Sequence, residues 1–133
     1  MIAVLDASAA VGVVLKQPQA AHLISQLESA NLVLAPALFV SEVCNAFWKY
    51  RKADLFEQAA VEVSLVQALE LPDRLEPASA CCQEAFAMAV RRQHPFYEAL
   101  YLVLARRHNA TLLTIDKRLA ALAAKLEIAT SCC

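Results

Sequence analysis

The chain has 133 residues, 59% of them hydrophobic, which is long enough to bury a core without disulfides, and we expect a single domain over residues 1–133. Its apolar runs are too short for a membrane-spanning helix and its first residues lack the basic flank of a signal peptide, so we expect a cytoplasmic protein. The net charge of −1 argues at first sight against a nucleic-acid partner.

The first element is a buried strand at residues 2–5, a short apolar run that ends at Asp6. Ser8 is in position to cap the helix that follows, at residues 9–16. After a proline comes a second predicted helix, at residues 19–30. The chain thus opens with one strand and two helices.

The middle of the chain begins with a second buried strand at residues 32–35, directly before a proline. Two helices are predicted next, at residues 37–53 and 56–69, and the first ends in a run of cations that complements the helix dipole. The proline within residues 70–76 favours a short edge strand there.

The last third is predicted to hold two helices, at residues 78–93 and 96–108, and then a strand and helix pair. The strand at residues 110–115 is apolar and β-branched, and the helix at residues 117–126 is amphipathic. Residues 127–130 can add a fifth strand.

This alternation of strands and helices implies right-handed crossovers and helices on both faces of the sheet. We predict a three-layer α/β/α fold with a central, mostly parallel sheet of four to five strands. Ligands bind such sheets beyond the carboxyl ends of the strands. Asp6 and Asp116 each follow a strand directly, so the topology brings these two acids to the same edge.

Both acids have a structural alternative, because an Asp after a strand can simply cap the next helix. Ser8 competes with Asp6 for that function, which favours a ligand role for Asp6. For Asp116, before the helix at residues 117–126, the sequence leaves both interpretations open.

Glu42 lies inside a predicted helix, and its neighbours one turn away, Leu38, Phe39 and Ala46, are apolar. An unpaired buried carboxylate is unfavourable, and a metal ion would neutralise it. Asn45 offers an amide that could orient the carboxylate. The alternative is a salt bridge to a lysine on a half-exposed face.

Glu98 stands in the first turn of a predicted helix, where the helix dipole favours an acid without any further function. Its importance depends on the surrounding motif. Four segments carry that motif: Val4-Leu5-Asp6-Ala7-Ser8, Ser41-Glu42-Val43-x-Asn45-Ala46, Tyr97-Glu98-Ala99-Leu100-Tyr101-Leu102 and Leu113-Thr114-Ile115-Asp116-x-Arg118-Leu119.

In this order and spacing, the four segments resemble the PIN-domain ribonucleases, and among them the VapC-type toxins of bacterial toxin–antitoxin pairs. The resemblance covers essentially the whole chain. Each segment is a weak motif alone, whereas all four together are specific. The resemblance implies a PIN-like fold and hydrolysis of RNA that leaves a 5′-phosphate and a 3′-hydroxyl.

The resemblance also implies a metal site. Four clustered carboxylates cannot all stay ionised without a cation, and Mg²⁺ or Mn²⁺ prefers oxygen ligands. The implied ligands and catalytic residues are Asp6, Glu42, Glu98 and Asp116. Ser8 and Thr114 would support them by holding water or the substrate phosphate. The five cysteines and three single histidines lack zinc-site spacing, and Cys132 and Cys133 are interpreted as a reactive tail.

Glu98 departs from the family pattern, which usually has Asp at this position. The longer side chain keeps the carboxylate but moves it one methylene further from the backbone. We therefore expect a reduced or altered metal preference rather than loss of activity.

Cations for the RNA phosphates are predicted near the site. If the four acids belong to a metal site, −1 minus −4 leaves +3 on the rest of the chain. Lys117 and Arg118 lie beside Asp116, and Arg91 and Arg92 precede the turn that leads to Glu98. A solvated helix face is the alternative for each of these cations. The small excess suits single-stranded or loop RNA better than a long duplex.

Residues 37–69 are unusually apolar and aromatic. By resemblance, this helix pair forms a groove for the C-terminal segment of an antitoxin protein, and the chain associates as a homodimer.

Two other functions share part of this pattern. Phosphotransfer enzymes of the haloacid-dehalogenase or receiver type also place an Asp after the first strand, but they need a second acid nearby or a lysine after a late strand. Ala7 and Ser8 follow Asp6 here, and Lys117 belongs to a helix, which disfavours that class. A PIN-like RNA-binding or scaffold domain with weak or no catalysis is the stronger alternative, because of Glu98.

Overall fold

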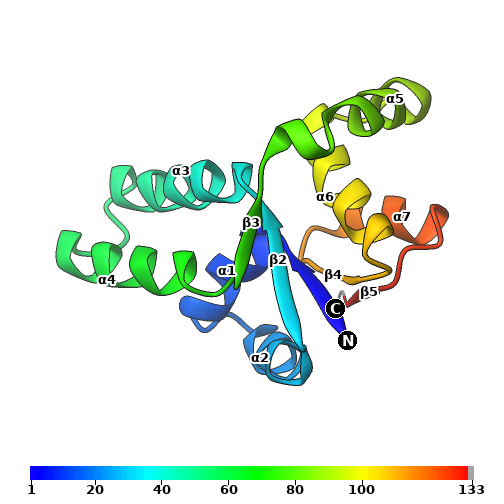
Figure 1. Cartoon of the computed structure of the whole chain (residues 1–133). Coiled ribbons are helices and arrows are strands. Elements are labelled where there is room, and N and C mark those ends of the chain that lie inside the picture. Colours follow the sequence, from blue (N-terminus) through cyan, green and yellow to red (C-terminus); the bar gives the residue numbers. More distant parts are fainter. Residues whose placement is uncertain (132–133) are drawn as a thin grey trace.

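The computed structural model describes residues 1–131, so the predicted reactive tail, Cys132 and Cys133, lies outside the described residues. Its centre is a five-stranded sheet in the order β3-β2-β1-β4-β5 (Figure 1). All four strand pairs are parallel. The strands are β1 (Ile2–Leu5), β2 (Leu32–Pro36), β3 (Arg74–Glu76), β4 (Thr111–Leu113) and β5 (Thr130–Ser131).

Seven helices cover the two faces of the sheet, in a three-layer α/β/α arrangement that confirms the predicted fold class (Figure 1). They are α1 (Ala7–Val14), α2 (Ala20–Ser29), α3 (Leu38–Lys52), α4 (Gln58–Leu69), α5 (Cys82–Arg92), α6 (Phe96–Arg107) and α7 (Lys117–Lys125). Within residues 1–131, no helix combines the length and the apolar character needed to cross a bilayer.

Each face of the sheet has its own core. Ala3 and Leu5 of β1 pack with α1 to α4, while Val4 between them packs with α5 to α7. This is the alternation of side chains expected of a strand that is buried on both faces. It explains why β1 is a continuous apolar run that stops at the first polar residue, Asp6.

The helix predicted at residues 78–93 is interrupted. A 3₁₀ turn, η1 (Ala78–Ala80), precedes α5, and Cys81 between them leaves helical geometry with φ −124°. Cys81 is buried in the core beside α6, so tertiary packing redirects the chain there. The predicted strand at residues 70–76 is also shorter, because only the part after Pro72 pairs with β2.

Candidate active site

The four predicted acids line one small cavity at the carboxyl edge of the sheet. Its volume is about 140 Å³. Asp6 arrives from the end of β1, Glu42 from α3, Glu98 from the first turn of α6, and Asp116 from the start of α7. Tyr101 of α6 lines the same cavity. Two strand ends and two helices therefore bring together acids that are far apart in the sequence.

Asp6 is the most deeply buried of the acids, with 5% of its surface exposed. Its Oδ1 accepts hydrogen bonds from Ala9 N at 2.9 Å and Ser8 Oγ at 2.8 Å, and its Oδ2 accepts one from Thr114 Oγ1 at 2.6 Å. Burial raises the pKa of Asp6 from 3.8 to about 6, although these three hydrogen bonds oppose the rise and the charge of Glu42 adds to it. A carboxylate held in this way is unfavourably charged at neutral pH.

Ser8 does not cap the first helix, and that prediction is wrong. Asp6 is the N-cap residue of α1, because its carboxylate accepts the hydrogen bond from Ala9 N. The Ser8 hydroxyl instead donates to Asp6 and lies 3.4 Å from Thr114 Oγ1. The Asp6 carboxylate therefore both caps α1 and lines the cavity. These two functions, predicted as alternatives, are compatible.

Asp116 likewise combines both interpretations that the sequence left open. Its Oδ1 accepts hydrogen bonds from the backbone N–H groups of Arg118 at 2.9 Å and Leu119 at 3.2 Å, so it caps α7. Its own N–H donates to Thr114 Oγ1 at 3.0 Å. Thr114 therefore connects Asp6 and Asp116, the two acids that follow strands.

Glu42 is half-buried, and its carboxylate accepts a hydrogen bond of 2.5 Å from the Tyr101 hydroxyl. Burial raises the pKa of Glu42, the Tyr101 hydrogen bond lowers it, and the charge of Glu98 raises it. None of the ion pairs within residues 1–131 involves Glu42, so the predicted alternative of a lysine partner is not observed. The observed donor to Glu42 is Tyr101, while Asn45 is exposed and lines a neighbouring pocket.

Tyr101 is the site residue that the sequence analysis missed, because a tyrosine in an apolar helix is typical of a core. Burial raises its pKa well above the ordinary range, and the negative charge of Glu42 adds to this effect. The hydroxyl therefore keeps its proton and acts as a donor. A signal was available in the sequence, since Tyr101 lies three residues after Glu98 and so on the same side of the helix.

Glu98 contacts two basic side chains. Its Oε1 accepts a hydrogen bond from Arg118 Nη2 at 2.6 Å, and its Oε2 lies 3.1 Å from His94 Nδ1. The Glu98 and His94 side chains are each 19% exposed. Arg118, predicted as a cation for RNA phosphates, and His94, for which no function is predicted, both lie against Glu98.

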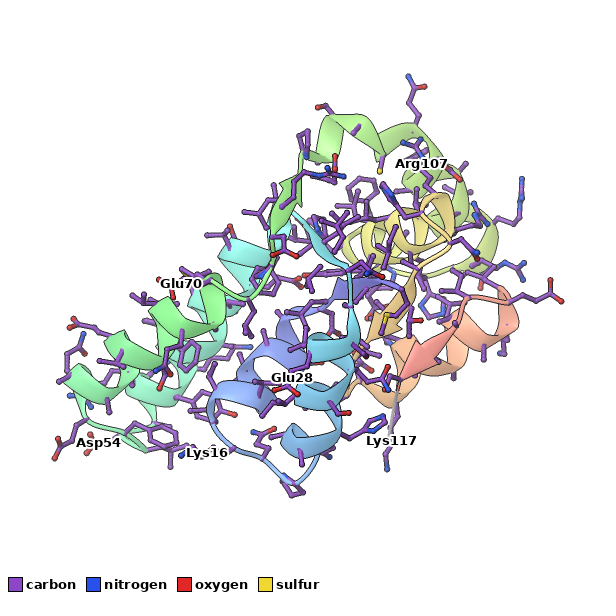
Figure 2. All side chains as sticks on the ribbon, turned by 60° about the horizontal axis from the view of Figure 1, so that its bottom comes forward. Lys16, Glu28, Asp54, Glu70, Arg107 and Lys117 are labelled. Atoms are coloured by element: carbon purple, nitrogen blue, oxygen red, sulfur yellow. The ribbon has the colours of Figure 1, made fainter. Side chains whose placement is uncertain are left out.

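The other predicted cations, Lys117, Arg91 and Arg92, are exposed and do not line the acid cavity. Lys117 begins α7, next to Asp116, and the two arginines lie in the last turn of α5. Figure 2 shows Lys117 near the start of α7 on the molecular surface.

The residues around the cavity fit a hard divalent ion by their chemistry. In the described part of the chain, no three His, Cys, Asp or Glu side chains already form a group that could hold an ion. The cavity nevertheless offers carboxylate and hydroxyl oxygens, which Mg²⁺ and Mn²⁺ prefer. A cation would also offset the unfavourable burial of the charged Asp6 carboxylate.

Comparisons with known proteins agree with this architecture. The PIN domain family model matches residues 3–125. The chain is 35% identical over 117 residues to Ribonuclease VapC12 of Mycobacterium tuberculosis, covering 88% of each protein. It is 29% identical over 122 residues to Ribonuclease VapC3 of Pyrobaculum aerophilum, covering 88% of this chain and 91% of that protein. The crystal structure of PAE2754 from Pyrobaculum aerophilum has a TM-score of 0.72 and 26% identity, covering 96% of this chain and 98% of that one.

Proposed function

This chain belongs to the PIN-domain family, and on that premise we propose that it is a Mg²⁺- or Mn²⁺-dependent endoribonuclease, the toxin of a toxin–antitoxin pair. One observation carries the proposal: Asp6, Glu42, Glu98 and Asp116 line one cavity at the carboxyl edge of the sheet. The names of the two VapC relatives support ribonuclease activity, and the antitoxin partner follows from the resemblance to VapC-type toxins. The family match also favours this function over an aspartyl-phosphate enzyme.

The protein's own groups would position the reaction. Hydrogen bonds from Ser8 and Thr114 fix the Asp6 carboxylate, and Tyr101 fixes that of Glu42. A divalent ion bound among these acids would supply a Lewis acid that polarises the scissile phosphate and lowers the pKa of the attacking water. Hydrolysis would leave a 5′-phosphate and a 3′-hydroxyl.

A direct assay tests this proposal. Purified protein is incubated with single-stranded RNA in Mg²⁺ or Mn²⁺ and, in parallel, in EDTA. We expect cleavage only with the metal, loss of cleavage in Asp6→Ala, and normal cleavage in Asp54→Ala, which removes an exposed acid at the tip of the α3–α4 hairpin (Figure 2). Cleavage that persists in EDTA or in Asp6→Ala would refute the metal-dependent nuclease.

A second function is favoured by the contacts of Glu98. Because His94 and Arg118 already pair with this carboxylate, the domain could bind RNA with little or no catalysis. The same assay separates the two functions, since RNA that binds tightly and stays intact at every metal concentration identifies the binding or scaffold domain.

Exposed apolar side chains support the proposed protein partners. An antitoxin segment is proposed to bind the α3–α4 hairpin, where the large exposed apolar residues are Val40, Trp48, Leu55, Phe56, Val63 and Val66.

A homodimer contact is proposed at α5 and the start of α6, where the large exposed apolar residues are Phe86, Val90 and Tyr97. Light scattering should show a dimer that Phe86→Glu dissociates and Gln67→Glu, on α4, preserves. We also propose a cytoplasmic location for the pair.

A further inference from the structure

A second, larger pocket lies beside the acid cavity. Its volume is about 580 Å³, and it shares Ala7, Ser8 and Glu42 with the acid cavity. We call it the side pocket; the residues that distinguish it are Val11, Gln17, Asn45, Ala46, Lys49, Tyr50, Leu55 and Ile115. The shared residues place the side pocket directly next to the acid cavity.

The lining of the side pocket suits a flat, polar ring. Leu55 and Ile115 are apolar, and Tyr50 adds an aromatic ring. Asn45 and Gln17 carry amides, each with donors and an acceptor. Apolar and aromatic walls with a few polar groups are typical of small-ligand sites of this size.

The only glycine of the chain shapes this pocket. Gly12 lies in the interior of α1, where glycine is less favourable than alanine. A Cβ atom at this position would lie 3.3 Å from Gln17 Oε1, closer than most such contacts, and at van der Waals distance, 3.4 Å, from Ile115 Cδ1. Gly12 therefore allows two residues of the side pocket to approach the helix.

Gln17 also joins the two sides of the pocket. Its Nε2 donates to the Tyr50 hydroxyl at 3.4 Å, which connects the end of α1 to α3. Because the Tyr50 oxygen accepts this bond, its own proton is left to donate to a bound molecule.

We propose that the side pocket binds the unpaired nucleobase of the nucleotide next to the scissile phosphate. This inference rests on the proposed ribonuclease function. Unstacked bases are commonly held against aromatic side chains and read through hydrogen bonds to their edges. Tyr50 and the amides of Asn45 and Gln17 supply both kinds of contact, and Lys49 supplies a cation for the backbone phosphate.

Apart from Leu55, which both lines the side pocket and belongs to the exposed apolar set of the hairpin, the two sides of α3 separate this ligand from a protein partner. Glu42, Asn45 and Lys49 follow one another at helical spacing on the pocket side. Val40 and Trp48, which are exposed and apolar, share a different stripe of the same helix. The polar stripe adjoins the acids, so RNA is the occupant that the geometry favours there.

A matched pair of lysines allows a sharp test. Lys49→Ala and Lys52→Ala remove the same charge from the last turn of α3, but only Lys49 lines the side pocket. Ala46→Leu fills the pocket without changing charge. The affinity for a fluorescent single-stranded RNA is measured by anisotropy in EDTA, where no metal-dependent cleavage occurs. Lys49→Ala and Ala46→Leu should each weaken binding about tenfold, as for one lost base or phosphate contact, and Lys52→Ala less than about twofold.

Cleavage in Mn²⁺ of RNAs with a single abasic nucleotide, moved along the strand, locates the base. One abasic position beside the cut should slow the wild-type protein about tenfold and Ala46→Leu hardly at all. RNA that binds all variants equally, with circular dichroism confirming their folds, would overturn the side-pocket proposal and leave the pocket to a protein partner. RNA that binds through the pocket but is never cut would refute the ribonuclease alone. RNA that every variant cuts at the wild-type rate would refute the pocket alone.

Discussion

The buried carboxylate of Asp6 makes the ion-free protein less stable at neutral pH than it would be without that charge. Its pKa rises from 3.8 to about 6 on folding, mainly because of burial. At about 1.4 kcal/mol per pKa unit, this difference corresponds to about 3 kcal/mol. Since the folded-state pKa is the higher one, this stability is fully present below pH 3.8 and is lost as the pH rises through about 6.

Asp6→Asn removes the charge and can retain the contacts. The amide oxygen can accept from Ala9 N and Ser8 Oγ, and the amide nitrogen can donate to the second lone pair of Thr114 Oγ1. The Thr114 proton, which Asp6 accepts in the wild type, can then turn toward Ser8 Oγ, 3.4 Å away. We therefore expect the variant to be about 2 to 3 kcal/mol more stable than the wild type at pH 7, and about equal to it near pH 4. The same variant should lose cleavage.

Urea denaturation in EDTA, repeated from pH 4 to pH 8, measures this difference. Glu28→Gln is the control, because Glu28 is exposed on α2, and neutralising it should change stability by less than about 0.5 kcal/mol (Figure 2). A stability difference between Asp6→Asn and wild type that is the same at pH 4 and pH 7, or that favours the wild type at pH 7, would refute the reasoning. Added Mn²⁺ should stabilise the wild type and not the variant.

Three further substitutions test individual contacts. Arg118→Ala removes a cation that pairs with Glu98, so titration calorimetry should show Mn²⁺ binding up to about fivefold tighter than in the wild type. Arg118→Lys keeps the charge and should bind Mn²⁺ with nearly the wild-type affinity. Weaker Mn²⁺ binding in Arg118→Ala would contradict this prediction. Tyr101→Phe removes the hydrogen-bond donor to the half-buried Glu42 and should lower the free energy of unfolding at pH 7 by about 1 kcal/mol. An unchanged free energy of unfolding would show that water replaces the hydroxyl. Gln93→Gly should raise the free energy of unfolding by about 1 kcal/mol, and with it the melting temperature, because φ at this position is 54°, which glycine adopts without strain. Gln93→Ala should give no such increase. Equal melting temperatures in the two variants would exclude a backbone cause.

The two longest strands, β1 and β2, could be predicted well because each is a buried apolar run that ends at a polar or proline residue. Residues 2–5 and 32–35 are such runs, and the structure places strands there. The strand order β3-β2-β1-β4-β5 was not predicted, since an apolar run does not encode which neighbour it pairs with. The break at Cys81 was missed for a similar reason, because packing against α6 decides it.

The positions of Asp6 and Asp116 followed from one rule, that the carboxyl ends of parallel strands share an edge. The hydrogen-bond partners of the site residues were harder to predict from the sequence, because they depend on how α3, α6 and α7 face one another. The contact of His94 with Glu98 could not be predicted from helical spacing, because His94 lies before Pro95, the N-cap residue of α6. Tyr101 could not be predicted as the partner of Glu42 either, because the two lie on different helices.

The four acids therefore differ in how much each needs a cation. Glu98 already has Arg118 and His94 as partners, so its longer side chain is accommodated by protein contacts alone. Asp6 has only neutral donors around a buried charge, and Glu42 has a single tyrosine hydroxyl. We infer that attraction for an ion comes chiefly from Asp6 and Glu42. On that basis we expect that a Glu in place of the family's usual Asp at position 98 changes metal preference more than it changes whether a metal binds.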